Sequence, residues 1–153
     1  MTRAPFQVLV FPFRLSADGG WEFAVFRRSG EGWWQGISGG GENNETPLQA
    51  AHRECGEEAG IPASSRFVPL DTTASIKVTW FSGSQHWGDR YVIPEYAFGV
   101  ACTADTAFML SDEHDEYRWL PYAEAESLVR FDSNRTALWE LDLRLRGLPA
   151  QRS

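Results

Sequence analysis

The alternation of apolar and polar segments divides the chain into short strands joined by turns. Apolar runs of four or more residues bounded by turn residues predict strands. These strands are expected at residues 6–14, 21–28, 67–70, 74–81, 91–102 and 117–120. The turn cluster at 16–20 makes the first two strands a hairpin. Residues 30–41, which are rich in glycine and tryptophan, are expected to form a loop.

Helical signals follow in three places. The segment 46–59 begins with Thr46-Pro47-Leu48-Gln49, which fits a capping box with proline at the first helical position, and Gly60 ends it. Two further helices are expected at 122–129 and 133–146. A long helix between groups of strands indicates a mixed α/β fold.

The length and composition of the chain indicate its number of domains and its net charge. With 153 residues, 42% hydrophobic and 23% charged, the chain is expected to form one domain over residues 1–153 with its own core. The formal net charge of −7 argues against a broad basic surface for duplex nucleic acid. An acidic protein can still bind polyanions when divalent cations lie between the two.

Targeting signals are missing from the sequence as it stands. The apolar run at 6–13 is too short to span a bilayer and contains Pro12. Cys55 and Cys102 have no CxxC partner, so both are expected to be reduced thiols. A cytoplasmic protein without a membrane partner is therefore expected, and the oligomeric state stays open between monomer and homodimer.

The helix at 46–59 is expected to have an apolar and an acidic side. At 100° per residue, its apolar face contains Leu48, Ala51, Cys55 and Ala59. Glu54, Glu57 and Glu58 gather beside that face, where like charges repel one another. Converging carboxylates next to a glycine-rich loop favour a hard divalent cation, which prefers oxygen ligands. The alternative is a solvated acidic surface, the usual fate of glutamate pairs on helices.

Residues 39–61, GGGENNETPLQAAHRECGEEAGI, decide between these two interpretations. This segment resembles the Nudix box, the signature of Nudix hydrolases, G-x5-E-x7-R-E-U-x-E-E-x-G-U, in which U is a bulky apolar residue. All seven fixed positions match, at Gly39, Glu45, Arg53, Glu54, Glu57, Glu58 and Gly60. Cys55 is a small residue for the first U position. Asn44 stands where many members have glycine, although asparagine tolerates left-handed backbone.

The resemblance implies the Nudix fold, a mixed β-sheet between helices in an α/β/α arrangement. It also implies that Glu54, Glu57 and Glu58 hold Mg²⁺ or Mn²⁺, with Glu57 and Glu58 acting in catalysis. Arg53 and Glu45 would pair to brace the loop against the helix. Gly39 and Gly40 would let the backbone approach substrate phosphates, as glycine permits.

Family members often add a carboxylate from a distant loop before a Tyr/Arg-Trp-Leu strand. Here that loop is 111–116, and Glu113 is the first choice for a further metal ligand or general base, with Glu116 second. The alternative for this loop is an acidic, solvated segment. Arg27 is expected to bind a phosphate or to be a solvated strand end, and Ser38 to donate to a substrate oxygen or to complete a turn.

Short matches narrow the expected substrate. They are Trp34-Gln35, Ser38-Gly39, the stretch EHDEYRWL at residues 113–120 and Ser133-Asn134-Arg135. They resemble the subgroup that hydrolyses dihydroneopterin triphosphate and nucleoside triphosphates to a monophosphate and pyrophosphate. The ligand would then be a small phosphorylated metabolite. The alternatives are a nucleotide sugar, a dinucleoside polyphosphate or capped RNA as substrate, or a non-catalytic ligand sensor, which commonly loses the glutamates kept here.

Some aromatic and polar residues stay ambiguous. Trp33, Trp34 and Trp87 are expected either to stack on a ring of the substrate or to fill the core. Asn134 is expected either to contact the ligand or to take part in capping the last helix behind Ser133.

Overall fold

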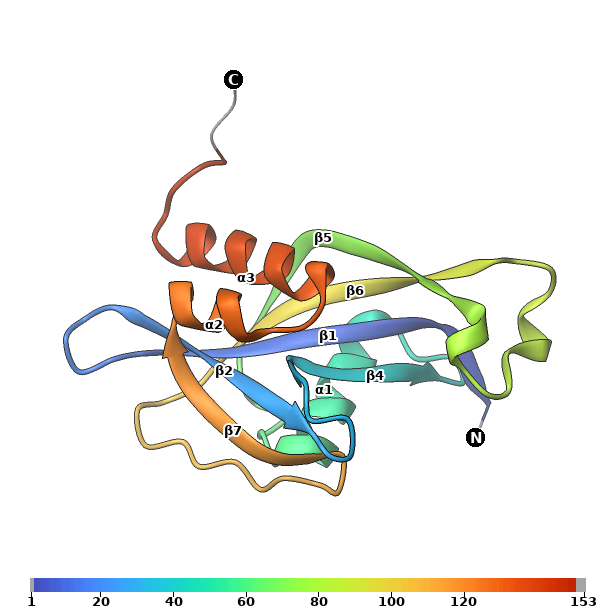
Figure 1. The fold of residues 1–153 in the computed structure, drawn as a ribbon, viewed down its shortest axis with the longest axis horizontal. Helices are drawn as coiled ribbons and strands as arrows, with labels where there is room; N and C mark the ends of the chain where they lie inside the picture. The colour runs from blue at the N-terminus through green and yellow to red at the C-terminus, as the bar shows by residue number, and fades with distance from the viewer. Residues whose placement is uncertain (1, 151–153) are drawn as a thin grey trace.

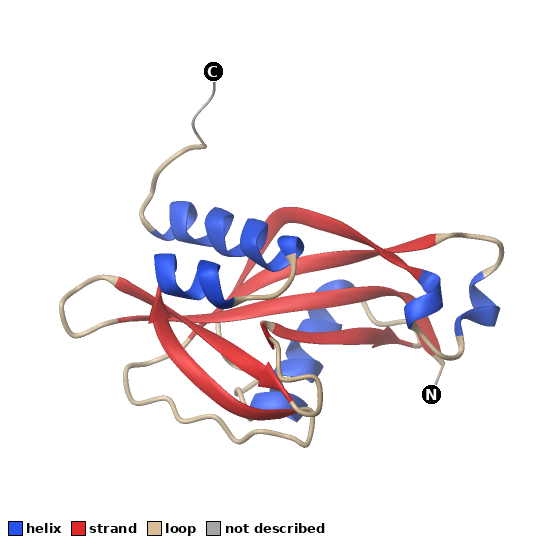
Figure 2. Cartoon of the chain, viewed as in Figure 1, coloured by secondary structure: helices blue, strands red, loops and turns tan. Residues whose placement is uncertain are grey.

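The computed structural model describes residues 2–150 as a mixed sheet with helices on both faces (Figures 1 and 2). The strands are β1 (Arg3–Leu15), β2 (Trp21–Arg28), β3 (Trp34–Gln35), β4 (Ile37–Glu42), β5 (Phe67–Lys77), β6 (Val92–Ala101) and β7 (His114–Pro121). The helices are α1 (Pro47–Ala59), α2 (Tyr122–Leu128) and α3 (Asp132–Leu145), with short 3₁₀ turns at Val78–Trp80 and Ser84–Trp87.

Strand β1 lies at the centre of the sheet. It pairs antiparallel with β4 through its first half and with β2 through its end, and it runs parallel to β6 on its other side. Strand β5 pairs with β6, and β7 and β3 pair with β2. Because β1 has neighbours on both sides and helices on both faces, it is buried from Gln7 to Phe13.

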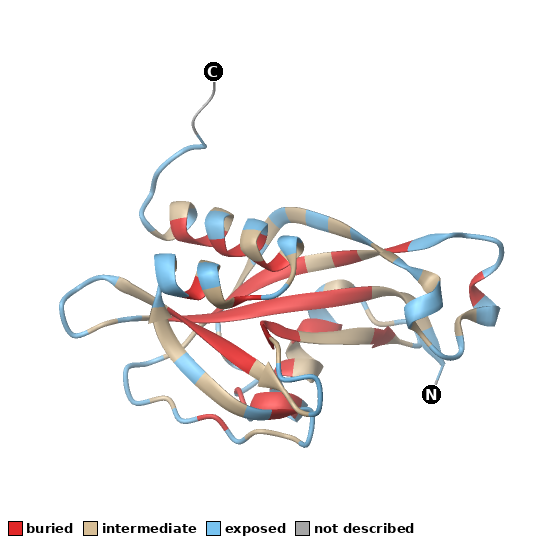
Figure 3. Ribbon diagram, viewed as in Figure 1, coloured by how far each residue is buried: buried red, intermediate tan, exposed pale blue. Residues whose placement is uncertain are grey.

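The side chains of β1 alternate between two hydrophobic layers. Val8 and Val10 pack with the residues of α1, whereas Leu9 and Phe11 pack with those of α2 and α3. Figure 3 shows buried residues along β1 and on the side of α3 that faces the sheet. The expected α/β/α arrangement is therefore confirmed.

Helix α1 begins and ends where its sequence predicts. The Thr46 hydroxyl accepts from the Gln49 amide at 3.2 Å, the Gln49 side chain accepts from the Thr46 amide at 2.8 Å, and Gly60 is left-handed with φ of 70°. The expected buried face was wrong for Leu48, which is 41% exposed. The buried stripe is centred nearer Ala51 and Glu58, so that Leu48 falls at its margin.

Several strand boundaries differ from the expectation. The segments 67–70 and 74–81 form one strand, β5, whose pairing register shifts between Pro69 and Thr73. The expected loop at 30–41 contains β3 and β4, because glycines weaken the strand signal without preventing a ladder. Strand β7 begins at His114 rather than at 117.

The expectations for the loop before α1, for the cysteines and for membrane spans can also be compared with the structure. The left-handed non-glycine residue before α1 is Asn43, with φ of 51°, rather than Asn44. Cys55 and Cys102 are both free thiols, as expected. Within residues 2–150, none of the helices is long and apolar enough to cross a bilayer.

Candidate functional site

Strand β4 is built from glycines that admit charged side chains from both faces of the sheet. Gly39 pairs with Val8, so its missing side chain would point towards α1. A Cβ there would collide with the carboxylate of Glu54, which occupies that space. Gly40 faces the other way, and a Cβ on it would lie 2.8 Å from Nε of Arg3. The two glycines therefore let Glu54 and Arg3 approach the same strand backbone.

Arg53 and Glu45 form the brace between the loop and α1. The guanidinium donates to both Glu45 oxygens, from Nε at 2.8 Å and from Nη2 at 3.0 Å, and Nη2 also donates to the Gly40 carbonyl at 2.8 Å. These hydrogen bonds lower the pKa of Glu45 and raise the pKa of Arg53 from their ordinary values. The structure thus joins the beginning of α1, the turn before it and β4 through one arginine.

The three glutamates of α1 have different surroundings. Glu54 has a side chain 12% exposed, and burial raises its pKa to about 7 although Arg53 opposes the shift. The charges of Glu57 and Glu113 add to the rise. Glu57 is 61% exposed, and it accepts from Arg53 at 3.2 Å. Glu58 is 3% exposed, and neither of its carboxylate oxygens has a hydrogen-bond partner in the part of the chain described.

These carboxylates supply oxygen ligands of the kind that a divalent cation prefers. Among residues 2–150, no three acidic, histidine or cysteine side chains form a ready-made metal cluster. Arg53 donates to Glu54 at 2.9 Å as well as to Glu57, so it now offsets part of their repulsion. The unpartnered oxygens of Glu58 and the raised pKa of Glu54 are both conditions that a cation would relieve. Mg²⁺ commonly takes one or two carboxylates and completes its shell with water and phosphate oxygens.

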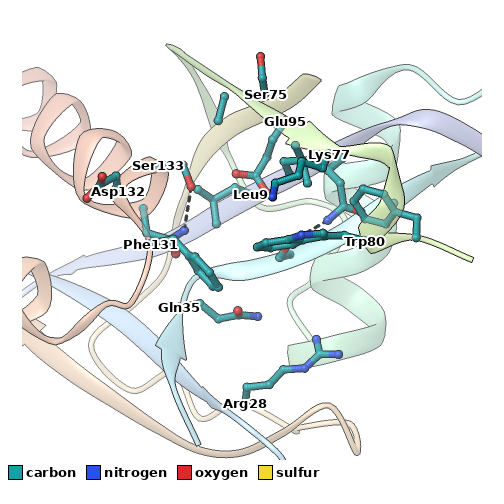
Figure 4. Close-up of a pocket in the computed structure, with 18 of the residues that line it drawn as sticks. Leu9, Arg28, Gln35, Ser75, Lys77, Trp80, Glu95, Phe131, Asp132 and Ser133 are labelled. Atoms are coloured by element: carbon teal, nitrogen blue, oxygen red, sulfur yellow. Dashed lines mark hydrogen bonds between the residues drawn. The ribbon is translucent and has the colours of Figure 1, made fainter. Parts of the chain in front are cut away.

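A cleft of about 900 Å³ opens beside the glycine strand (Figure 4). It crosses β4, β1 and β6 on the sheet face that also holds α3. Its polar lining includes Arg3, Gln7, Arg28, Ser38, Glu54, Glu95, Glu113, Ser133 and Asn134. Its aromatic lining consists of Trp33, Trp80, Phe81 and Phe131. The volume suits a small-molecule ligand.

The structure brings most of the expected site residues to this cleft. Ser38, Gly39, Gly40, Glu54 and Glu113 line it, whereas Glu57 and Glu58, on the same helix as Glu54, are not among its lining residues. The Glu113 carboxylate is 3.9 Å from Nη1 of Arg28 and close enough to Glu54 to affect its pKa.

Two candidates lie away from the cleft. Arg27 pairs with Asp115 at 2.8 and 3.0 Å and does not line the cleft, because successive residues of a strand face opposite sides. Its neighbour Arg28 does line it. Glu116 pairs with Arg118 at 3.0 Å and is also outside the lining.

The tryptophans and the asparagine for which the sequence left two roles open lie partly in the core and partly at the cleft. Trp34 and Trp87 are buried, whereas Trp33 lines the cleft. Asn134 is buried in the cleft wall, where its Oδ1 accepts from the Gly36 amide at 2.8 Å.

Several cleft residues were missed by the sequence analysis, and Arg3 and Glu95 show two different reasons. Arg3 lies at the start of the first strand, where nothing in the sequence distinguishes it from a solvated residue. Glu95 gave a usable signal, because it is a lone carboxylate inside an apolar strand, and it is 7% exposed.

Comparison with known proteins shows similarity over most of the chain. The sequence profile described as NUDIX domain matches residues 7–139. The dihydroneopterin triphosphate diphosphatase of Escherichia coli K12 is 30% identical over 122 residues, which are 73% of this chain and 76% of that protein. A NUDIX hydrolase structure from Listeria monocytogenes superposes with a TM-score of 0.85 at 39% identity, covering 94% of this chain and 96% of the other. The structure of the E. coli dihydroneopterin triphosphate pyrophosphohydrolase superposes with a TM-score of 0.75 at 24% identity, covering 94% and 99%, and it supports the fold alone.

Proposed function

The chain belongs to the Nudix family of hydrolases, and we propose on this basis that it cleaves a nucleoside or pterin triphosphate to a monophosphate and pyrophosphate with the help of a divalent metal ion. The observation that supports this most strongly is Glu58, one helical turn from Glu54, whose buried carboxylate has no hydrogen-bond partner within residues 2–150. A buried, unpaired carboxylate is costly, and a bound cation removes the cost.

Mg²⁺ or Mn²⁺ would be held by Glu54, Glu57 and Glu58, with Glu113 contributing from the loop before β7. When bound, the ion neutralises phosphate oxygens and lowers the pKa of a bound water. Glu113 and Glu57, both exposed enough to exchange protons with solvent, are the proposed groups that take up the proton from the attacking water.

The remaining residues of the cleft bind and orient the phosphates. Gly39 and Gly40 present backbone without side chains, and the Ser38 hydroxyl lies next to them on the same strand. Arg3 and Arg28 line the cleft with guanidinium groups that match phosphate geometry. They are better placed for this role than Arg27, whose charge is engaged by Asp115.

The substrate class rests on the similarity to the dihydroneopterin triphosphate diphosphatase and on the aromatic lining of the cleft. An acidic protein with a net charge of −7 suits a small phosphorylated metabolite bound through a cation better than it suits duplex nucleic acid.

A panel of substrates tests the proposal. Dihydroneopterin triphosphate, nucleoside triphosphates, a nucleotide sugar, diadenosine tetraphosphate and capped RNA are each incubated with Mg²⁺, with separate detection of phosphate and pyrophosphate. We expect turnover of a triphosphate with release of pyrophosphate, loss of activity in excess chelator and recovery with Mg²⁺ or Mn²⁺. Turnover confined to another member of the panel would replace the substrate class, and full turnover in chelator would refute the metal-dependent reaction.

A further inference from the structure

Glu95 is a buried carboxylate in the cleft to which the proposed hydrolysis gives no role. Glu95, on β6, is 7% exposed and lines the cleft. Figure 4 shows it among Ser133, Leu9 and Lys77. Burial raises its pKa to about 7, and only the nearby Ser133 hydroxyl opposes the rise. No salt bridge to Glu95 forms within residues 2–150, although Lys77 lines the same cleft.

The register of the sheet determines how far Glu95 lies from Gly40, where the phosphates are proposed to bind. Glu95 pairs with Gln7, and Gln7 pairs with Gly40, so the three residues form a row across β6, β1 and β4 on the face that holds the cleft. Neighbouring strands are about 4.8 Å apart, which puts Glu95 roughly 10 Å from Gly40. A ligand with phosphates at Gly40 would therefore bring a different chemical group to Glu95.

The walls near Glu95 suit a flat ring. Trp80 and Phe131 line the cleft with ring centroids 6.2 Å apart, and the ring of Trp33, which also lines it, lies 5.5 Å from that of Phe131. Trp80 is 63% exposed, so its face is available to a ligand. Aromatic side chains stack on planar rings, and the edge of a ring held in this part of the cleft would face the Glu95 carboxylate.

An ionised carboxylate only accepts hydrogen bonds, and it pairs best with two adjacent N–H donors. Guanine and pterin rings share such an edge, in which a ring N–H lies beside an exocyclic amino group. The corresponding edge of adenine or cytosine presents one donor beside an acceptor nitrogen, which a carboxylate would repel. Glu95 therefore favours the first class of ring and disfavours the second.

We propose that Glu95 determines specificity by accepting two hydrogen bonds from the 2-amino-4-oxopyrimidine edge that guanine and pterin rings share. The proposal rests on the proposed function for the position of the phosphates. It gives a role to a carboxylate that is buried in the cleft without a salt bridge among the described residues. A site built around such a pair rejects an analogue that lacks the amino group, because the buried acceptor is then left unpaired.

Binding by matched compounds tests the proposal without any need for hydrolysis. Isothermal titration calorimetry compares GMP with IMP, which lacks the 2-amino group, and pterin with lumazine, which has an oxygen in its place. We expect the 2-amino compound to bind at least about tenfold more tightly in one of the two pairs, the scale of a hydrogen bond to a charged group. The pair that shows the difference identifies the ring.

Two variants assign the effect to Glu95. Glu95→Gln keeps the size of the side chain but replaces one acceptor by a donor, and it should lose most of the discrimination. Asp132→Asn is the matched control, because Asp132 also lines the cleft but its side chain is 95% exposed and paired with Arg135, and it should keep the discrimination. Equal affinities within both pairs in the wild type, no binding of the 2-amino compounds, or unchanged discrimination in Glu95→Gln would each overturn the proposal. Because the readout is binding, a protein that fails to release pyrophosphate can still pass or fail this test.

Discussion

At the scale of single residues, burial separates the glutamates of α1 that look equivalent in the sequence. Glu57 is a surface residue and Glu54 lies at the cleft. Glu58 is buried, and neither of its carboxylate oxygens has a hydrogen-bond partner among the residues that the structure describes. Unpaired buried carboxylates are rare because no hydrogen bond or ion pair offsets the free energy of removing them from water. Glu58 is therefore the residue whose surroundings would change most on binding of the proposed cation.

Glu58→Gln tests this dependence. The variant should lose about 10²-fold or more in kcat, the scale seen when a preorganised electrostatic contribution is removed. In chelator its unfolding temperature should equal or exceed that of the wild type, since a charge without a partner has been deleted. Addition of Mg²⁺ should raise the unfolding temperature of the wild type but not that of the variant. Near wild-type turnover would show that the assignment of this helix face is wrong.

Glu113 and Glu116 form a matched pair of carboxylates on one loop and strand. Glu113 lines the cleft, whereas Glu116 is paired with Arg118 outside it. Glu113→Gln should lower kcat by about 10²-fold, the scale of a general base. Glu116→Gln should change kcat little. If steady-state kinetics show the reverse, Glu116 and not Glu113 corresponds to the carboxylate of the family pattern.

At the scale of elements, β4 connects the two sides of the sheet. Its glycines give Glu54 and Arg3 room that any side chain would fill. Gly39→Ala should therefore displace the Glu54 carboxylate and lower kcat at least tenfold, an effect of the size expected when a catalytic group moves by about 1 Å. Gly56→Ala is the control, because its Cβ would meet only the Ile61 carbonyl at 3.8 Å. In a helix this change should raise stability by about 0.5–1 kcal/mol and leave kcat unchanged. Equal kinetics for both variants would contradict the role given to Gly39.

The turn before α1 depends on the pair between Glu45 and Arg53. Glu45→Gln should lower the free energy of unfolding at neutral pH by about 1.5–3 kcal/mol, the range for hydrogen bonds to charged groups. Because the folded state lowers the pKa of Glu45, this stabilisation exists above the ordinary carboxyl range and is lost as the pH falls through the lowered pKa. Urea unfolding at several pH values should show the difference between wild type and variant shrinking in acid. A difference that is the same at all pH values would point to packing instead.

The sequence predicted the helices well and the cleft only in part. Capping residues and glycine define the ends of α1 locally, so Thr46 and Gly60 were sufficient. Strand β4 was missed because its glycines serve contacts with Glu54 and Arg3, which are distant in sequence. Arg27 and Arg28 are neighbours with opposite faces, and only the register of β2 shows which one reaches the cleft.

At the scale of the whole molecule, the sheet separates the acidic helix from the cleft. Helix α1 lies on one face of the sheet and α3 on the other (Figure 1). The cleft opens on the face covered by α3. The two meet at the glycine strand, where Glu54 reaches the cleft. In the proposed binding mode the phosphates lie at the glycine strand, next to the carboxylates of α1, and the part of the cleft near Glu95 holds the rest of the ligand.

The site of attack on a triphosphate tests the central claim most directly. Dihydroneopterin triphosphate is hydrolysed with Mg²⁺ in ¹⁸O-labelled water, and the products are identified by mass spectrometry. The account predicts pyrophosphate and a monophosphate, because the glycine strand and the nearby arginines hold the leaving group, and it places the label in the monophosphate. Orthophosphate as the only phosphate released, or label found in pyrophosphate, would contradict it.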